Sequence, residues 1–142
     1  EDDVEEAAAD PFEFVPPAPI LSTLPDEFYT HLSSSKWKDR KELALDPLLS
    51  LLQAPRLENG NYDELTRALA GRMTDANVVC VQLAAGCLEQ LAKGLRDEFA
   101  KYRGAVVAPV LARTKEKKAS VLDALGGALD AFFLSVSPFY AS

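Results

Sequence analysis

Three segments of this chain resemble one another at a spacing of about 40 residues, a period typical of helical repeat proteins. They begin at Ser34, Asp75 and Lys115 and read SSKWKDRKELALDPLLSLL, DANVVCVQLAAGCLEQLAKGL and KEKKASVLDALGGALDAFFL. In such proteins each unit is a pair of helices that buries its apolar face only against its neighbours. The spacing therefore predicts a stack of three helix pairs before any single residue is interpreted.

Apolar residues occupy the same rungs when the three segments are set in register. The aligned positions are Ala44, Ala84 and Leu125, then Leu48, Leu88 and Leu129, then Leu51, Leu91 and Phe132. Within each segment these positions recur at intervals of three and four residues, which is the period of one face of an amphipathic helix. The chain is therefore predicted to be all-α, with this stripe buried in the second helix of each pair.

The same register places Trp37, Asn77 and Lys118 at one equivalent position, in the loop before each second helix. Equivalent loops of stacked repeats lie along one edge, where they can form an elongated binding site. Trp37 is flanked by serines and lysines, so it is predicted either to anchor a partner or to fold back as a staple on its own helix. The KEKK loop is compatible with solvated charge, but its alignment with Trp37 favours contact with an acidic protein surface.

Turn and loop signals set the helix boundaries. The predicted helices cover residues 26–33, 36–53, 62–73, 77–93, 95–113 and 119–134. Pro47 is predicted to kink or locally break its helix. Asn77 or Asp75 is predicted to cap the fourth helix, and Gly94 to end it.

By composition the chain divides into an acidic and Pro-rich linker at 1–25, three repeats at 26–136 and a C-terminal tail at 137–142. The linker also holds apolar residues such as Phe12 and Ile20, so part of it is predicted to lie against the repeats. Its first ten residues contain six acids and no base, which leaves the rest nearly neutral despite the net charge of −7. Nucleic-acid binding therefore has no support, and no apolar run is long enough to predict a membrane span. The expected location is the cytosol.

No pattern of residues predicts catalysis, a metal site or a cofactor. The chain lacks a phosphate-binding glycine loop and any nucleophile with a neighbouring base, and its single histidine, His31, is predicted at a helix surface. Cys80 and Cys87 fall two turns apart on one helix, which is too far for a disulfide. Without further ligands they are predicted to be buried, reduced thiols.

The strings LPDEFYTHLSSSKWKDRKE, PRLENGNYDELTRALAGRMTDANVVCVQLAAGCLEQLAKGLRDEF and KYRGAVVAPVLARTKEKKASVLDAL resemble the TOG domains of chTOG- and Stu-type microtubule polymerases. The resemblance covers residues 20–136 and is greatest to the second domain of such an array. It implies the N-terminal half of a HEAT-repeat domain, whose loops bind curved, soluble αβ-tubulin and contact mainly β-tubulin. The tubulin-binding residues that it implies are Lys36, Trp37, Asn77, Val78, Lys115, Lys117 and Lys118.

The resemblance further implies a module that promotes plus-end growth, located in the cytoplasm at microtubule plus ends and at the spindle or spindle pole. Two alternatives stay open: a CLASP-type TOG regulator of microtubule dynamics, and a HEAT-type scaffold that binds another protein through its helical face. Because only three repeats are present, we expect weaker binding than by a six-repeat domain. We also expect self-association through an uncapped C-terminal face that includes Val121, Leu125, Phe132 and Phe133.

Overall fold

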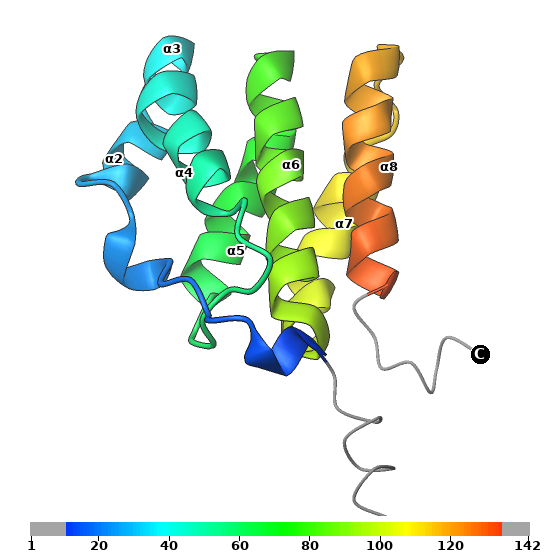
Figure 1. Ribbon diagram of the computed structural model, residues 1–142. Helices are drawn as coiled ribbons and strands as arrows, with labels where there is room; N and C mark the ends of the chain where they lie inside the picture. The colour runs from blue at the N-terminus through cyan, green and yellow to red at the C-terminus, as the bar shows by residue number, and fades with distance from the viewer. Residues whose placement is uncertain (1–10, 135–142) are drawn as a thin grey trace, which may run out of the picture.

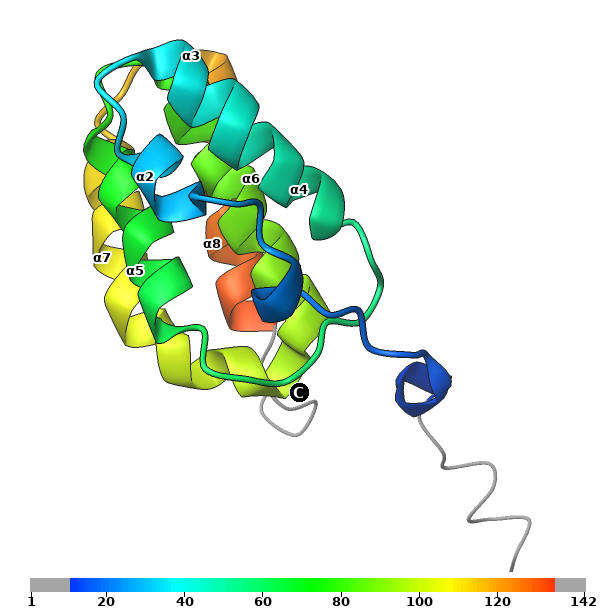
Figure 2. The ribbon, with the colours of Figure 1, turned by 90° about the vertical axis from the view of Figure 1, so that its left-hand side faces the viewer.

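The computed structural model describes residues 11–134, and its helices form two layers (Figures 1 and 2). One layer holds the first helix of each pair: α2 (Phe28–Leu32), α5 (Asp63–Gly71) and α7 (Arg103–Arg113). The other holds the second helices: the continuous run of α3 (Trp37–Asp39), η3 (Arg40–Leu45) and α4 (Asp46–Leu51), then α6 (Val78–Leu95) and α8 (Ala119–Leu134). Residues 11–134 contain no strand, and the three helix pairs confirm the predicted all-α repeat fold.

Short 3-10 helices mark several connections and the N-terminal segment. They are η1 (Pro11–Phe14), η2 (Leu21–Thr23), η4 (Arg72–Thr74) and η5 (Arg96–Tyr102). The segment at residues 115–118 joins α7 to α8. The helix boundaries predicted from the sequence agree with the structure to within a few residues. Within the helix predicted at residues 95–113, residues 96–102 form the 3-10 helix η5, and α7 follows directly from Arg103.

Pro47 lies inside an unbroken helical run, and the run changes helix type just before it. The segment η3 is a π-helix, and Pro47 is the second residue of α4. Proline has no N–H to donate and its ring crowds the carbonyl four residues earlier, here that of Leu43 within η3. A π-helix pairs residues five apart, so the wider turn accommodates the proline. The predicted local break is thus a local change of hydrogen-bond register.

The aligned rungs form the core. Seven of the nine predicted positions are buried: Ala44, Leu48, Ala84, Leu88, Leu91, Leu125 and Phe132. Leu51 and Leu129 are only partly buried. Phe132 stacks on Phe99 of η5, with ring centroids 5.4 Å apart, and so joins the last helix to the preceding connection.

Helix α6 is the central element of the stack, between the α3–α4 run and α8 (Figure 1). The helical run Val78–Arg113 is long and apolar enough to span a bilayer, by length and composition alone, contrary to the expectation from the sequence. However, 56% of its most apolar window is buried within the protein. Packing on both sides therefore accounts for the apolar composition of α6.

Gly94 does not end α6, contrary to the prediction. The helix continues to Leu95, and Arg96 follows with a φ of 53°. A Cβ atom on Gly94 would lie 2.4 Å from Cγ of Leu57, whose backbone N–H donates to the Gly94 carbonyl at 3.1 Å. Gly94 is therefore required for close packing of the inter-repeat loop, and not for helix termination.

Residues 11–24 form an N-terminal strap that starts near the C-terminal end of α6 and runs along the first-repeat side of the stack to α2 (Figures 1 and 2). The Ala18 N–H donates to the Arg56 carbonyl, and its own carbonyl accepts from the Glu58 N–H, both at 2.9 Å. Ile20 is fully buried, and its N–H donates to the Glu58 carboxylate at 2.9 Å. Part of the predicted linker therefore packs against the repeats, as its apolar residues indicated.

A pair of arginines holds the start of the strap. Arg56 donates to the carbonyls of Glu13 and Val15 at 3.0 and 3.1 Å. The guanidinium groups of Arg56 and Arg96 also lie 5.3 and 4.5 Å from the centroid of the Phe12 ring. Cation–π contacts of this kind attach the strap to two connections that are distant in sequence.

The apolar face predicted to be open at the C-terminal end is largely closed. Val121, Leu125 and Phe132 are buried, in a helix that packs mainly on α6 and, through Phe132, on η5. Leu122 and Phe133 follow Val121 and Phe132 by one residue, which rotates them by about 100° around the helix axis and exposes them. Phe133 is 54% exposed, as predicted, and the tail predicted at 137–142 lies outside the described residues.

Candidate functional site

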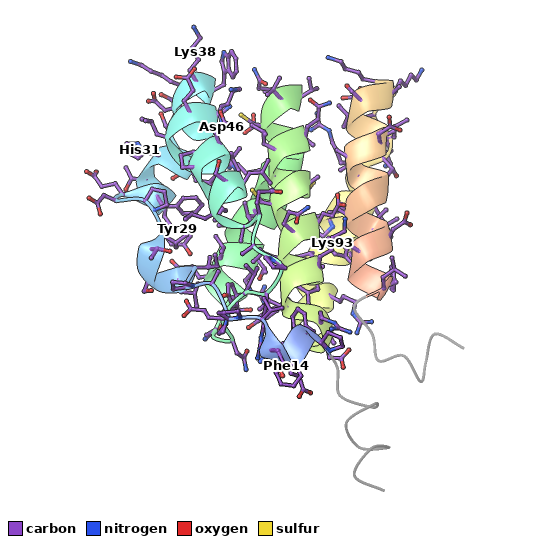
Figure 3. The ribbon with its side chains drawn as sticks, viewed as in Figure 1. Phe14, Tyr29, His31, Lys38, Asp46 and Lys93 are labelled. Carbon is purple, nitrogen blue, oxygen red and sulfur yellow. The ribbon has the colours of Figure 1, made fainter. Side chains whose placement is uncertain are left out.

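The three loops aligned by the repeat lie at one end of the stack. Helices α3, α6 and α8 all begin at the same end, which is uppermost in Figure 1. We call residues 34–37, 74–78 and 115–118 the loop edge. Lys38, one residue beyond the first loop, projects at this end, whereas Phe14 of the strap lies at the opposite end (Figure 3).

The predicted contact residues differ in exposure. Trp37 is 38% exposed, and four lysines of the loop edge are exposed: Lys36, Lys115, Lys117 and Lys118. Asn77 and Val78 are half-buried, and Val78 packs against the core. The structure thus brings the seven predicted residues to one edge, but it leaves mainly the aromatic and the cations available to a partner.

The Asn77 side chain already has a structural role. Its Oδ1 accepts the Val79 N–H at 2.9 Å and so caps α6, as one of the two predictions for this helix proposed. Asp75 is not that cap. Its Oδ1 instead accepts the Asn77 N–H at 2.8 Å, which fixes the turn that leads into the helix.

Asp75 joins the second loop to the first repeat. Its two carboxylate oxygens accept from Nε and one terminal nitrogen of Arg40, each at 2.8 Å, in a bidentate pair. The other terminal nitrogen of Arg40 donates to the Ser34 carbonyl at 2.7 Å, and Arg72 lies 3.4 Å from the same carboxylate. The side chain of Asp75 is 1% exposed, so the pair is largely shielded from water.

The charged form of Asp75 is maintained by its partners. Burial alone would raise the pKa of this carboxyl, but the hydrogen bonds from Arg40 and the Asn77 N–H lower it below its usual value. The hydrogen bond to Asp75 in turn raises the pKa of Arg40. Both groups are therefore ionised at neutral pH, and the link between the first two loops is a salt bridge with fixed geometry.

Arg113, the last residue of α7, joins the second loop to the third. One terminal nitrogen donates to the carbonyls of Met73 and Asp75 at 2.9 and 3.1 Å. The other lies 3.4 Å from Oε2 of Glu116. Oε1 of Glu116 accepts the N–H groups of Lys117 and Lys118 at 2.9 and 3.4 Å, and these bonds lower the pKa of the carboxyl.

Sequence reasoning missed Arg40, Arg113 and Glu116 as residues of the loop edge. One signal was present in the repeat itself, because Arg72 and Asp75 occupy the positions equivalent to Arg113 and Glu116. In both repeats the arginine lies three residues before the acid, and the acid accepts the N–H two residues further on. The partners of Arg40 could be identified only from the tertiary structure.

Neither cysteine is exposed at the loop edge. Cys80 and Cys87 are buried free thiols, and burial raises the pKa of each. Cys80 Sγ lies 3.7 Å from the Trp37 carbonyl, so it packs directly behind the first loop. Within the described part of the chain, no group of three or more His, Cys, Asp or Glu residues could hold a metal ion.

Comparison with known proteins gave both sequence and structural matches, although no family model matches the chain. Protein mini spindles of Drosophila melanogaster is 45% identical over 130 residues, which make up 90% of this chain and 6% of that protein. A structure solved to explain microtubule plus end tracking by XMAP215, CLIP-170 and EB1 superposes with a TM-score of 0.82 at 44% identity. That match covers 89% of this chain and 53% of the solved chain.

A second solved structure explains tubulin recruitment and assembly by microtubule polymerases with tumor overexpressed gene (TOG) domain arrays. It superposes with a TM-score of 0.83 at 40% identity, over 95% of this chain and 28% of the solved chain. The chain thus spans only a small part of the length of Protein mini spindles, and about half or less of the two solved chains.

Proposed function

This chain belongs to the family of TOG domains found in the Mini spindles and XMAP215 proteins, and from that premise we propose that it binds αβ-tubulin through its loop edge. The observation that carries the proposal is the alignment of three ordered loops along one edge of the stack. This arrangement offers an elongated surface that suits another protein rather than a small molecule.

The composition of the loop edge supports an acidic protein partner. Trp37 supplies apolar area from an exposed position, and Arg and Trp side chains are the residues most often found at the centres of protein interfaces. Lys36 beside it, and Lys117 and Lys118 in the third loop, add positive charge along the same edge, which attracts an acidic surface over distance. The edge is proposed to contact mainly β-tubulin, with Asn77 and Val78 between the aromatic and the lysines.

The proposed activity needs no chemical step. A loop edge held in one arrangement matches only one relative orientation of the surfaces that it contacts, which would explain preference for curved, soluble tubulin. Linked modules in a longer protein would bind with higher avidity than a single module, because linkage raises the effective concentration. They would deliver tubulin to growing plus ends, in the cytoplasm and at the spindle. We therefore propose a non-enzymatic role without a cofactor, in the manner of the polymerases that the similar structures represent.

Titration with purified tubulin tests the proposal. We expect Trp37→Ala to weaken binding by at least ~2 kcal/mol, roughly 30-fold in Kd, because truncating a buried interface anchor loses this much. The melting temperature of each variant is measured alongside, because only 38% of Trp37 is exposed in the free protein and loss of its covered part also lowers stability. Leu43→Ala is the matched control, because Leu43 is 44% exposed on the same helical run but lies outside the loop edge.

An equal loss of tubulin binding in both variants would argue against a specific role for the first loop. A large fall in melting temperature for Trp37→Ala, with unchanged binding by the folded fraction, would show that Trp37 is a staple on its own helix.

A scaffold function through the outward face of α8 is the remaining alternative, because Leu122 and Phe133 are exposed there. Self-association through this face stays a prediction that sedimentation velocity would test.

A further inference from the structure

We propose that Arg113 is a positioning residue for tubulin binding. It holds the second loop and the third loop, residues 115–118, which we call the lysine loop, in one arrangement, so that Val78 and Lys118 meet the partner together. This inference rests on the proposed function of the loop edge. Arg113 itself is half-buried beneath the loops, so it would act through the residues that it holds and not by contact with the partner.

The contacts of Arg113 reach across two repeats. Its guanidinium bridges the carbonyls of Met73 and Asp75 in the second repeat, and it pairs with Glu116 in the third. The planar guanidinium carries five N–H groups in a fixed fork, so it can satisfy two carbonyls and a carboxylate at once. A lysine at this position would keep the charge but not this geometry.

Glu116 connects Arg113 to the backbone of the lysine loop. One carboxylate oxygen faces Arg113, while the other accepts the backbone N–H groups of Lys117 and Lys118. The backbone from which these two lysines extend is therefore ordered by a side chain that Arg113 holds. The positive charges are fixed in place although the lysine side chains are exposed.

The first two loops are held by a different residue, and the comparison shows what Arg113 adds. Arg40 binds the side chain of Asp75, whereas Arg113 binds the carbonyl of the same residue. Asp75 is thus held from both neighbouring repeats, and a continuous series of contacts joins all three loops. Such preorganisation lowers the conformational entropy that binding would otherwise cost.

The test is a double-mutant cycle for tubulin affinity with Arg113→Lys and Lys118→Gln. Lys118→Gln alone should weaken binding by about 3-fold, in the range of an exposed charge pair. In the Arg113→Lys background its effect should fall to less than about 1.5-fold, because a lysine that is no longer held in register contributes little. Arg67→Lys is the control background, since Arg67 is exposed on α5 and pairs with Asp63 of the same helix.

An undiminished effect of Lys118→Gln in the Arg113→Lys background would overturn the proposal, because a purely structural arginine would leave the two changes additive. Circular dichroism should show that Arg113→Lys stays folded. If it does not, Glu116→Gln replaces it in the cycle, since it weakens the same pair from the other side. The same reduction in the effect of Lys118→Gln is expected in the Glu116→Gln background.

Hydrogen exchange gives a readout that does not depend on tubulin. In Arg113→Lys the amides of Lys117 and Lys118 should exchange at least ~10-fold faster, because their acceptor is no longer held, while amides in the middle of α6 keep their protection. Unchanged exchange at these two amides would overturn the proposal. If the wild-type chain fails to bind tubulin, the proposed function fails, and the exchange result still decides whether Arg113 orders the lysine loop.

Discussion

The two ends of the stack are held together by different physical means. At the loop edge, charged hydrogen bonds centred on Asp75 connect the three repeats, and the outermost side chains stay in contact with water. At the opposite end, buried apolar side chains hold the segments together. Ile20 of the strap, Leu57 of the inter-repeat loop and Tyr62 are all buried there, and the Tyr62 ring contacts Tyr102 of η5. The comparison indicates that a network of charged hydrogen bonds can fix backbone positions while other side chains stay available to a partner. Where apolar side chains are buried against one another, they are no longer available for binding.

Two buried tyrosines at the strap end, the end opposite the loop edge, also make hydrogen bonds within the protein. The Tyr102 hydroxyl accepts the Tyr62 N–H at 2.9 Å and donates to the Gly60 carbonyl at 3.0 Å. The Tyr62 hydroxyl donates to the Glu58 carbonyl at 2.7 Å, and burial raises its pKa. The bonds of Tyr102 join its segment to the start of the preceding repeat, and the groups that take part in them are not available to a partner.

Asp75→Asn should give the largest effect and would break the ionic half of the comparison. Removing one member of a buried ion pair leaves the other unpaired, which costs about 3–5 kcal/mol of unfolding free energy. Urea denaturation at pH 7 measures it. Asp63→Asn is the control, since its pair with Arg67 is exposed and should contribute less than about 1 kcal/mol. Equal losses in the two variants would show that Asp75 has no special role.

The same variant has a pH signature. Asp75 has a lowered pKa in the folded protein, so its stabilisation is fully present above the unfolded pKa of about 3.9 and is lost as pH falls through the folded value. The difference in unfolding free energy between wild type and Asp75→Asn should therefore be constant from pH 7 to about 5 and shrink below about 4. A constant difference down to pH 2 would contradict this.

Ile20→Ala tests whether the strap end depends on burial. Deleting most of a fully buried side chain should cost about 2–4 kcal/mol, from lost transfer free energy and the cavity left behind. Tubulin affinity per folded molecule should be unchanged, because the loop edge lies at the other end. Phe14→Ala, on the same strap but 77% exposed, should change stability by less than about 0.5 kcal/mol. A loss of affinity in Ile20→Ala would show that the two ends are coupled.

The regular part of this architecture was predictable because its signals are local. The helical period alone identified Leu48, Leu88 and Ala84 as core, and the repeat register brought Trp37, Asn77 and Lys118 to one edge. The unpredicted features arise from contacts between distant residues. Nothing near Gly94 in sequence reveals that Leu57 will pack on it, and nothing near Arg113 identifies the carbonyls of Met73 and Asp75 as its acceptors.

Gly94→Ala sharpens the comparison by a single methyl group at the strap end. The added Cβ would collide with Leu57 near its backbone, so repacking should cost about 1–3 kcal/mol. Gly126→Ala on α8 is the matched control, because no atom lies within 4 Å of the new Cβ. There the higher helix propensity of alanine should stabilise the protein by up to about 1 kcal/mol. Thermal or urea unfolding that moved both variants in the same direction would contradict this account.

Neutralising Lys115, Lys117 and Lys118 should give the smallest change in free energy per residue, below about 1 kcal/mol each, because these charges are exposed. We expect slower association with tubulin and a weaker dependence on salt, with little change in the dissociation rate, since charges at an interface rim mainly steer encounter. Stopped-flow measurements across a salt series give both rates. Unaltered association at every salt concentration would remove the third loop from the site.

The strap also determines how the molecule would respond to mechanical force. Tension applied at residue 11 does not act on the helices directly, because the Phe12 contacts with Arg56 and Arg96 and then the paired backbone of Ala18 lie in its path. Once these contacts have yielded, residues 11–24 can be drawn out to a total length of up to about 50 Å before α2 bears load. The strap should therefore detach in steps under load, before the repeats unfold. A force–extension trace would show these steps as small extensions that precede the main unfolding event.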